Sequence, residues 1–390
     1  MSHLSKMYKK ILYILNIFFK SKIIFKKPKY SHVIFIGKPI HHYDLFSKKN
    51  FKNLIANQNN TIAIWGEHYN FQILIRCVLK FKFSIIDYCQ EYIDQVNPKI
   101  VITLLDNNDI IYKLKLKKIK KIVIQNAYRF GTNVLNFKKK KIIKNSIDYM
   151  FVYNKSIGNY YRKELDTNIN DIGSFLLNDL DLNKKSKILY KYLYISVYRP
   201  LHKTIQNISP HTSYIKFNDQ EKKLVKLLYE YLVKKKQKLF ILGGNKFSYD
   251  EEYNYYKNII KKDQNWKLIK PKKRHYSFPY RCLMKSKNII GIDSSLLYES
   301  LSLKKKTIFF NCRVLDDYLF KNRNFAWPLN MKSEGIFWTN ELNQKKIASV
   351  LERIDKMSSI KWNKVLEKHN YLYSSDKGNK KFRKLLDTLI

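Results

Sequence analysis

From residue 31 onward, short apolar runs alternate with longer amphipathic segments, and this alternation restricts the possible folds more than any other feature. Runs such as "SHVIFIG" (31–37) and "KIVITLLD" (99–106) have the length and composition of strands. Between two such runs, the segment "YNFQILIRCVLKF" (69–81) has apolar residues at positions that form one face of a helix. The alternation predicts parallel sheets covered by helices.

The same pattern predicts the order of the elements. Strands are expected at 31–37, 60–66, 99–106, 120–126 and 148–154, and again at 191–198, 238–244, 265–271, 288–293 and 307–311. Helices are expected at 219–236, 250–262 and 279–286, with two or three Lys-rich helices between 343 and 390. A polar stretch at 176–187 interrupts the alternation and is interpreted as a linker.

The length of the chain favours two domains, since 390 residues exceed the roughly 100–200 residues of a usual domain. We therefore expect an α/β protein of two doubly wound, Rossmann-like domains, at 31–180 and 188–390, that face each other across a cleft. In such sheets, ligands bind beyond the carboxyl ends of the strands.

The first thirty residues differ from the rest of the chain. A nine-residue apolar run, Ile11 to Phe19, lies between lysines and is too short for a spanning helix, which needs about 20 apolar residues. Lysines follow it instead of a small-residue cleavage site. We expect 1–30 to form a basic amphipathic helix on an anionic membrane surface. A helix packed on the protein's own core is the alternative.

The charge of the chain is strongly positive, with 76 Lys and Arg against 31 Asp and Glu, or +45. Such a balance attracts polyanions, nucleotide phosphates or anionic lipids. Lys is accompanied here by abundant Asn, Ile, Tyr and Phe, so an AT-rich coding sequence explains the composition equally well. Because the basic residues are dispersed and no RNP-like run is present, no specific nucleic-acid partner is expected.

The four cysteines have no C-x-x-C spacing, and the chain is long enough to need no disulfides. They are expected to be reduced, buried thiols of a cytoplasmic protein. No zinc-ligand spacing occurs, and we expect no metal and no cofactor.

Polar residues follow the predicted strands, and the cluster of Asp293, Ser294, Ser295 and Glu299 has the clearest physical interpretation. A helix that begins near Ser295 would direct free N–H groups and its dipole toward a phosphate. Asp293 or Ser294 could equally be a simple helix cap.

Other strand ends supply weaker candidates. His42 and Asp44, or Asp106, could accept a proton from a hydroxyl group, although residues at such positions are more often exposed loop groups. Gly243 and Gly244 would allow close approach of a ligand, or form a plain turn. They belong to no G-x-G-x-x-G or P-loop motif, so a nicotinamide dinucleotide or an NTPase is not supported.

Four segments in order resemble the bacterial surface carbohydrate biosynthesis transferases, over roughly residues 60–385. The segments are "NPKIVITLLDNND", "KKIVIQNAYRFG", "IIGIDSSLLYESLSLKKKTIFF" and "FAWPLNMKSEGIFWTN". The chain departs from the family pattern at Ala127 and Leu297, where the family has glycine, and at Ser295, where it has threonine.

The resemblance implies a GT-B glycosyltransferase with the acceptor on the N-terminal domain and a nucleotide-activated donor on the C-terminal domain. It implies metal-independent transfer of a sugar to a capsule, O-antigen or similar surface-glycan acceptor, which is lipid-linked or free, at the cytoplasmic face of the membrane. A CDP-alditol-dependent polyol-phosphate transferase and a non-catalytic basic scaffold are the alternatives. By analogy, the residues around the donor are Asp293, Ser294, Ser295, Glu299, Arg199, Gly243 and Gly244, with Asn126, Arg129 and Asp106 across the cleft. Arg199, Lys270, Lys272, Lys273 and Arg274 are the candidates for a positive charge near the leaving phosphate.

Overall fold

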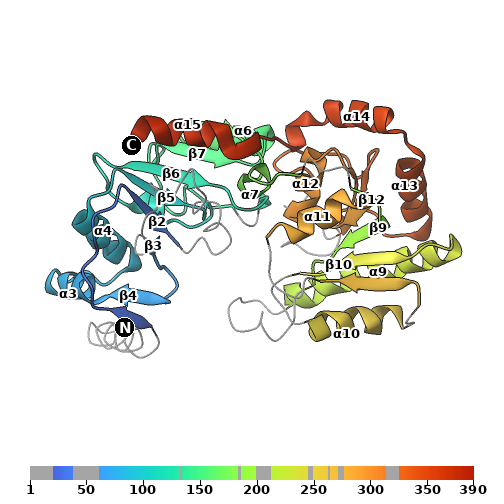
Figure 1. Ribbon diagram of the computed structural model, residues 1–390, viewed down its shortest axis with the longest axis horizontal. Helices are drawn as coiled ribbons and strands as arrows, with labels where there is room; N and C mark the ends of the chain where they lie inside the picture. Colours follow the sequence, from blue (N-terminus) through green and yellow to red (C-terminus); the bar gives the residue numbers. More distant parts are fainter. Residues whose placement is uncertain are drawn as a thin grey trace.

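The computed structural model describes residues 21–37, 61–131, 134–182, 186–198, 212–244, 249–261, 264–270, 276–312 and 325–390. Within these residues the chain forms two lobes, each built on a six-stranded parallel sheet, which lie side by side in Figure 1. The predicted fold class, two doubly wound Rossmann-like units, is confirmed. The domain boundaries at 31–180 and 188–390 remain a prediction.

The first lobe contains a sheet in the order β3-β2-β5-β6-β7-β8. Its strands are β2 (Val33–Ile36), β3 (Thr61–Ile62), β5 (Ile100–Thr103), β6 (Lys120–Ile124), β7 (Tyr149–Val152) and β8 (Asn168–Asp171). Its helices are α3 (Phe71–Leu79), α4 (Ile85–Val96), α5 (Ile110–Lys113), α6 (Lys155–Glu164) and α7 (Phe175–Asn178).

The second lobe contains a sheet in the order β11-β10-β9-β12-β13-β14. Its strands are β9 (Tyr190–Ile195), β10 (Leu239–Leu242), β11 (Trp266–Ile269), β12 (Ser286–Gly291), β13 (Lys306–Phe310) and β14 (Trp338–Thr339). Its helices are α9 (Thr212–Lys234), α10 (Tyr249–Ile260), α11 (Phe278–Met284), α12 (Ser295–Ser302), α13 (Gln344–Lys356) and α14 (Ser359–Lys368).

The strands read as continuous apolar runs because both faces of each sheet are covered. In β5, Ile100 and Ile102 belong to one buried cluster, whereas Val101 between them belongs to the other. Successive side chains of a strand point to opposite faces, so each face needs an apolar residue at every second position. Strands β8 and β14 were not predicted, since "NIND" is polar and β14 has two residues.

The last helix of the chain returns to the first lobe. After two short 3-10 turns, η5 (Asn370–Leu372) and η6 (Lys377–Asn379), helix α15 (Lys380–Leu389) lies across the first sheet in Figure 1. Its Phe382 is fully buried, with ring centroids 5.3 Å from Phe151 and 5.1 Å from Phe175. The C-terminal helices therefore contribute to both lobes.

The N-terminal segment differs from the expected helix where the structure describes it. Strand β1 (Lys22–Ile24) pairs in parallel with β4 (His68–Asn70). Backbone hydrogen bonding to β4 favours an extended conformation over these residues, so a helix through residue 30 was wrong. Residues 1–20, which carry the rest of this prediction, lie outside the described part of the chain.

Candidate functional site

Each of the two sheets has a point at which its strand order reverses. In the first sheet this point lies between β2 and β5, and in the second between β9 and β12. Crevices form at such switch points, beyond the carboxyl ends of the strands. Asp106 follows β5 and Asp293 follows β12, so both predicted aspartates lie at this edge of their sheets.

In the first lobe, Asp106 and Arg129 form a buried ion pair. The exposed fraction is 0% for Asp106 and 7% for Arg129, and Arg129 Nε donates to Asp106 Oδ2 at 2.9 Å. The guanidinium also donates to Asn126 Oδ1 at 2.7 Å, and the Tyr161 hydroxyl donates to Asp106 Oδ2 at 3.0 Å.

This geometry argues against the predicted role of Asp106 as a general base. Such a base must reach the proton that it removes, whereas both carboxylate oxygens of Asp106 face protein donors and are shielded from solvent. Asn126, in contrast, is exposed. The ion pair therefore orients the loop that carries Asn126.

In the second lobe, the start of α12 confirms the capping interpretation for Ser294. Its side chain accepts from the backbone N–H of Leu296 at 3.4 Å, as an N-cap does. Ser295 has a different partner, because its Oγ accepts from the backbone N–H of Tyr128 at 2.8 Å, across the two lobes. Both serines remain partly exposed, so a ligand can still reach this helix end.

Glu299 faces the first lobe from the next turn of α12. It is 6% exposed, and the Tyr153 hydroxyl donates to its Oε1 at 2.6 Å. Burial raises the pKa of Glu299, and hydrogen bonds from Tyr153, Tyr280 and Ser174 partly oppose this rise. A carboxyl group placed in this way is not open to a ribose hydroxyl, which differs from the predicted contact.

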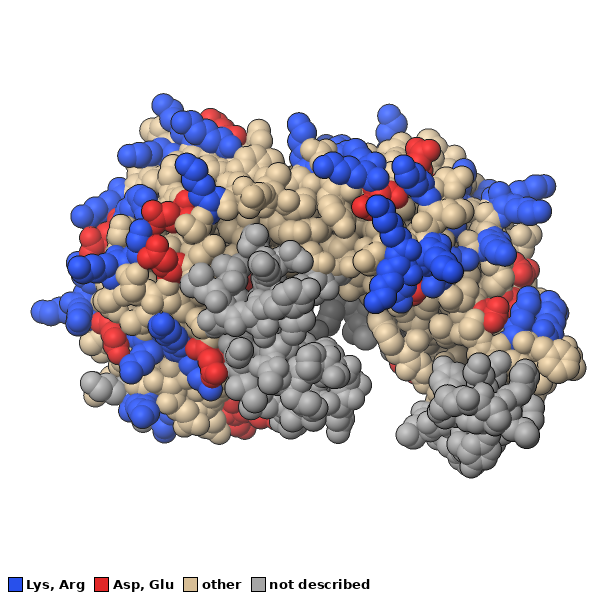
Figure 2. All heavy atoms as spheres, turned by 180° about the vertical axis from the view of Figure 1, so that it is seen from behind, with Lys and Arg blue, Asp and Glu red and all other residues tan. Residues whose placement is uncertain are grey.

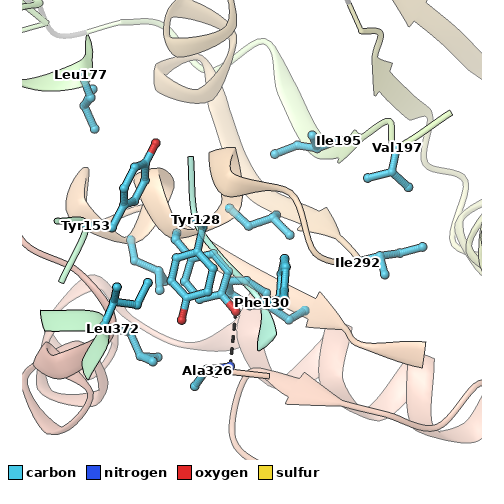
Figure 3. Close-up of a cluster of buried hydrophobic side chains, with 14 of the residues drawn as sticks. Tyr128, Phe130, Tyr153, Leu177, Ile195, Val197, Ile292, Ala326 and Leu372 are labelled. Atoms are coloured by element: carbon cyan, nitrogen blue, oxygen red, sulfur yellow. Dashed lines mark hydrogen bonds between the residues drawn. The ribbon is translucent and has the colours of Figure 1, made fainter. Parts of the chain in front are cut away.

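An aromatic stack joins the same two segments. The rings of Tyr128 and Tyr298 are parallel, with centroids 3.5 Å apart. The Tyr128 hydroxyl donates to the carbonyl of Trp327 at 2.8 Å, and the Tyr298 hydroxyl accepts from the N–H of Ala326. Figure 3 shows the ring of Tyr128 in a cluster that also includes Ile195 and Ile292 of the second lobe. Tyr298 belongs to the same buried cluster, so one apolar core is continuous between the lobes.

These contacts bring the four segments that carry the family resemblance together. The convergence of 104–109, 124–129, 293–300 and 325–330 is called the junction below. Asp106 contacts Arg129, Tyr128 contacts Ser295, and Trp327 contacts Tyr128. These contacts join residues as many as 199 positions apart in the sequence, and nothing in the spacing of the segments required that they meet.

The predicted glycine turn has a partner that sequence reasoning missed. Glu252 of α10 is fully buried, and it accepts from the N–H of Gly244 at 3.0 Å and from Lys270 Nζ at 3.0 Å. The Ser196 hydroxyl donates to it as well, at 2.5 Å. Gly244 N–H and Lys270 are therefore engaged with a carboxylate, which disfavours their predicted contact with a phosphate.

Several predicted residues lie outside the described part of the chain. They are His42, Asp44, Arg199, Lys272, Lys273 and Arg274. Their roles remain predictions.

The residues that sequence reasoning missed differ in how they could have been found. Tyr128 and Tyr298 lie inside the motif segments, but no single tyrosine could be distinguished in a chain that has 30 of them. Tyr153 lies near the end of the strand predicted at 148–154, which was a usable signal. Glu252 gave none, since an acidic residue in the first turn of a helix is ordinary.

The described residues define limits on other kinds of site. No group of three His, Cys, Asp or Glu in this part of the chain is placed to hold a metal ion. No helix among these residues is long and apolar enough to cross a bilayer. The four cysteines are free and buried, as predicted.

The surfaces outside the junction are less informative about ligands. Figure 2 shows Lys and Arg scattered over both lobes of this face rather than gathered in one groove. A cavity of about 240 Å³ lies elsewhere, between the end of α12 and the predicted linker, and contains none of the predicted site residues. Its lining residues are Leu177, Asn178, Leu180, Leu182, Met284, Ser302, Leu303, Ser375 and Lys377.

The sequence matches one known family. Residues 122–390 match the profile of a family described as "putative O-antigen biosynthesis protein". No curated protein matches the chain.

Solved structures with a similar fold come from several enzymes. The wall teichoic acid polymerase TagF is 13% identical, with 100% of this chain and 98% of TagF covered and a TM-score of 0.52. The UDP-GlcNAc 2-epimerase of Methanocaldococcus jannaschii is 13% identical, with coverages of 92% and 99% and a TM-score of 0.50. For the pneumococcal O-GlcNAc transferase GtfA, identity is 9% and the TM-score is 0.45, and the match covers 79% of this chain and 60% of GtfA. The likeness to TagF and the epimerase establishes the two-lobed GT-B fold.

Proposed function

The chain belongs to this O-antigen biosynthesis family, and from that membership we propose that it is a GT-B glycosyltransferase of surface-glycan synthesis. It would move a sugar from a nucleotide-activated donor to a glycan or lipid-linked glycan acceptor at the cytoplasmic face of the membrane. The observation that carries the proposal is the junction, where the four motif segments of the two lobes converge.

The donor is proposed to bind at the start of α12. The first backbone N–H groups of this helix and its dipole favour a diphosphate, and the partly exposed Ser294 and Ser295 add hydroxyl groups. Asn126 is exposed on the opposing loop, so it can contact the donor or the acceptor from the first lobe. A basic residue near the leaving phosphate, for which Arg199, Lys272, Lys273 and Arg274 stay the candidates, would complete this arrangement.

Catalysis is proposed to depend on stabilising the negative charge that develops in the transition state. In the transition state negative charge grows on the leaving nucleotide phosphate, and fixed N–H dipoles stabilise that charge without reorganising. The hydroxyl group of the glycan acceptor must lose a proton. His42 or Asp44 is proposed as the general base that takes this proton. Asp106 becomes a positioning residue in this scheme, because it fixes Arg129 and the loop of Asn126.

Transfer is proposed to need no divalent metal, because the helix terminus and basic side chains would supply the positive charge. Activity should persist in excess EDTA. Complete loss in EDTA, with recovery on adding Mg²⁺ or Mn²⁺, would contradict this part of the proposal.

The first experiment is a thermal-shift screen of the full chain with UDP-, GDP- and CMP-sugars and with CDP-alditols. A raised melting temperature with one nucleotide sugar, followed by transfer of its labelled sugar to a lipid-linked glycan, supports the proposal. Conversion of UDP-GlcNAc to its 2-epimer without transfer would refute it, since the same fold also serves an epimerase.

A polyol-phosphate transferase is the second candidate. TagF, which was solved with CDPG, matches the chain over its whole length. Stabilisation by CDP-alditols alone, with transfer of the alditol phosphate, would favour this candidate over the first.

A further inference from the structure

Helix α3 has apolar side chains on its outer face as well as on its buried face. Ile73 and Cys77 point into the core of the first lobe, with exposed fractions of 0% and 5%. On the other side, Ile75 is 42% exposed, Val78 47% and Leu79 73%. These three positions have the i, i+3, i+4 spacing of a single helix face.

The apolar stripe continues beyond both ends of the helix. Phe81, just after the helix, is 85% exposed. At the other end, Phe25 is 68% exposed, and its ring lies 5.1 Å from that of Phe71, the first residue of α3. Exposed apolar residues scattered singly are ordinary, but a contiguous group of this kind marks an interaction surface.

Basic side chains surround this stripe. Arg76 is exposed, and the Nζ atoms of Lys80 and Lys82 are held near Glu91, at 2.7 and 3.0 Å, with side chains 53% and 39% exposed. Exposed lysines also flank Phe25 on the β1 side, at Lys22, Lys26 and Lys27. The segment 71–82 contains no Asp or Glu.

We propose that the outer face of α3, formed by Ile75, Val78, Leu79 and Phe81, inserts into the headgroup region of an anionic bilayer. The exposed side chains of Arg76, Lys22, Lys26 and Lys27 then contact the lipid phosphates. A second copy of the chain fits this surface less well, since a twofold contact would bring the same cations together. Membrane binding by this surface does not require that the chain transfers a sugar.

The position of α3 agrees with such docking. The helix lies at the lower end of the first lobe in Figure 1. A bilayer against α3 would therefore lie at this end of the first lobe.

The test is flotation of the full chain with phosphatidylcholine vesicles, with and without about 30% phosphatidylglycerol. A Leu79→Glu/Phe81→Glu variant should lower binding to the anionic vesicles about tenfold or more, because charge would enter the apolar layer. Ile360→Glu is the matched control: Ile360, on α14 of the second lobe, is also 73% exposed, and its substitution should leave binding unchanged. Equal binding of both variants would overturn the proposal.

A second variant tests insertion directly and does not add charge. With Leu79→Trp, the added tryptophan fluorescence should shift to the blue and be quenched by lipids with brominated acyl chains, whereas Ile360→Trp should show neither change. Absence of quenching at position 79 would overturn the proposal. So would a dimer of the full chain that Leu79→Glu/Phe81→Glu dissociates while vesicle binding stays intact.

Discussion

Each lobe contains a buried ion pair at the carboxyl edge of its sheet, and the two pairs have different surroundings. The Asp106–Arg129 side chains are 0% and 9% exposed, and those of Glu252 and Lys270 are 1% and 8% exposed. In the first lobe the arginine also holds Asn126, on the loop whose Tyr128 contacts α12. In the second lobe the glutamate holds Gly244, within its own lobe.

This difference separates an ion pair that supports the contact between the lobes from an ion pair whose described contacts stay within one lobe. Because the first pair supports a loop that crosses to the other lobe, its loss should disturb both folding and the junction. Because the described contacts of the second pair, to Gly244 and Ser196, stay within its own lobe, the effect of its loss should be confined to that lobe. Burial is nearly equal in the two ion pairs. The expected difference in the effect of losing each pair therefore comes from their neighbouring residues and not from their solvent exposure.

The largest effect is expected for Arg129→Met. It leaves the carboxylate of Asp106 buried without its cation, which typically costs about 3–5 kcal/mol. Urea unfolding should show a loss of that size in the free energy of unfolding. Asp109→Asn is the control, since the Asp109 pair with Lys113 is partly exposed and should contribute less than about 1 kcal/mol.

A smaller loss is expected for Lys270→Met, about 1.5–3 kcal/mol, the range of a hydrogen bond to a charged group. Glu252 keeps its donors from Ser196 and Gly244, whereas Asp106 would keep, among the described residues, Tyr161 alone. Equal losses for Arg129→Met and Lys270→Met would break the distinction between the two pairs.

The smallest effect is expected for Glu299, at the contact between the lobes. This residue should make the free energy of unfolding depend on pH. Burial raises its pKa in the folded protein above the ordinary value of 4.5, so the folded chain holds this proton more tightly than the unfolded chain. The associated stability is present below pH 4.5 and is lost as the pH rises from there through the folded pKa. Glu299→Gln should therefore gain stability relative to the unsubstituted chain across that interval. A constant difference between the two in urea unfolding would show that Glu299 is not buried as described.

The sequence was sufficient for the architecture and insufficient for the partners within the site. Alternating apolar runs predicted the strands, because a sheet covered on both faces requires them. The switch-point rule placed Asp106 and Asp293 at the right edges. Neither rule could show that Arg129 neutralises Asp106, since ion pairing across 23 residues leaves no periodic signal. The return of α15 to the first sheet was equally hidden, because an amphipathic helix does not reveal which sheet it covers.

The central claim is that the start of α12 binds the nucleotide of the donor, and calorimetric titration tests it most directly. The ligand is the nucleotide sugar that stabilises the chain most in the thermal-shift screen, and the variant is Ser294→Ala/Ser295→Ala. Ser358→Ala is the matched control, because Ser358 caps α14 by accepting from Lys361 N–H at 3.2 Å and lies outside the four junction segments. Loss of two hydrogen bonds to a charged phosphate should weaken binding by about tenfold or more in the double variant, with no change in the control. Equal affinities for the unsubstituted chain and the double variant would contradict the claim.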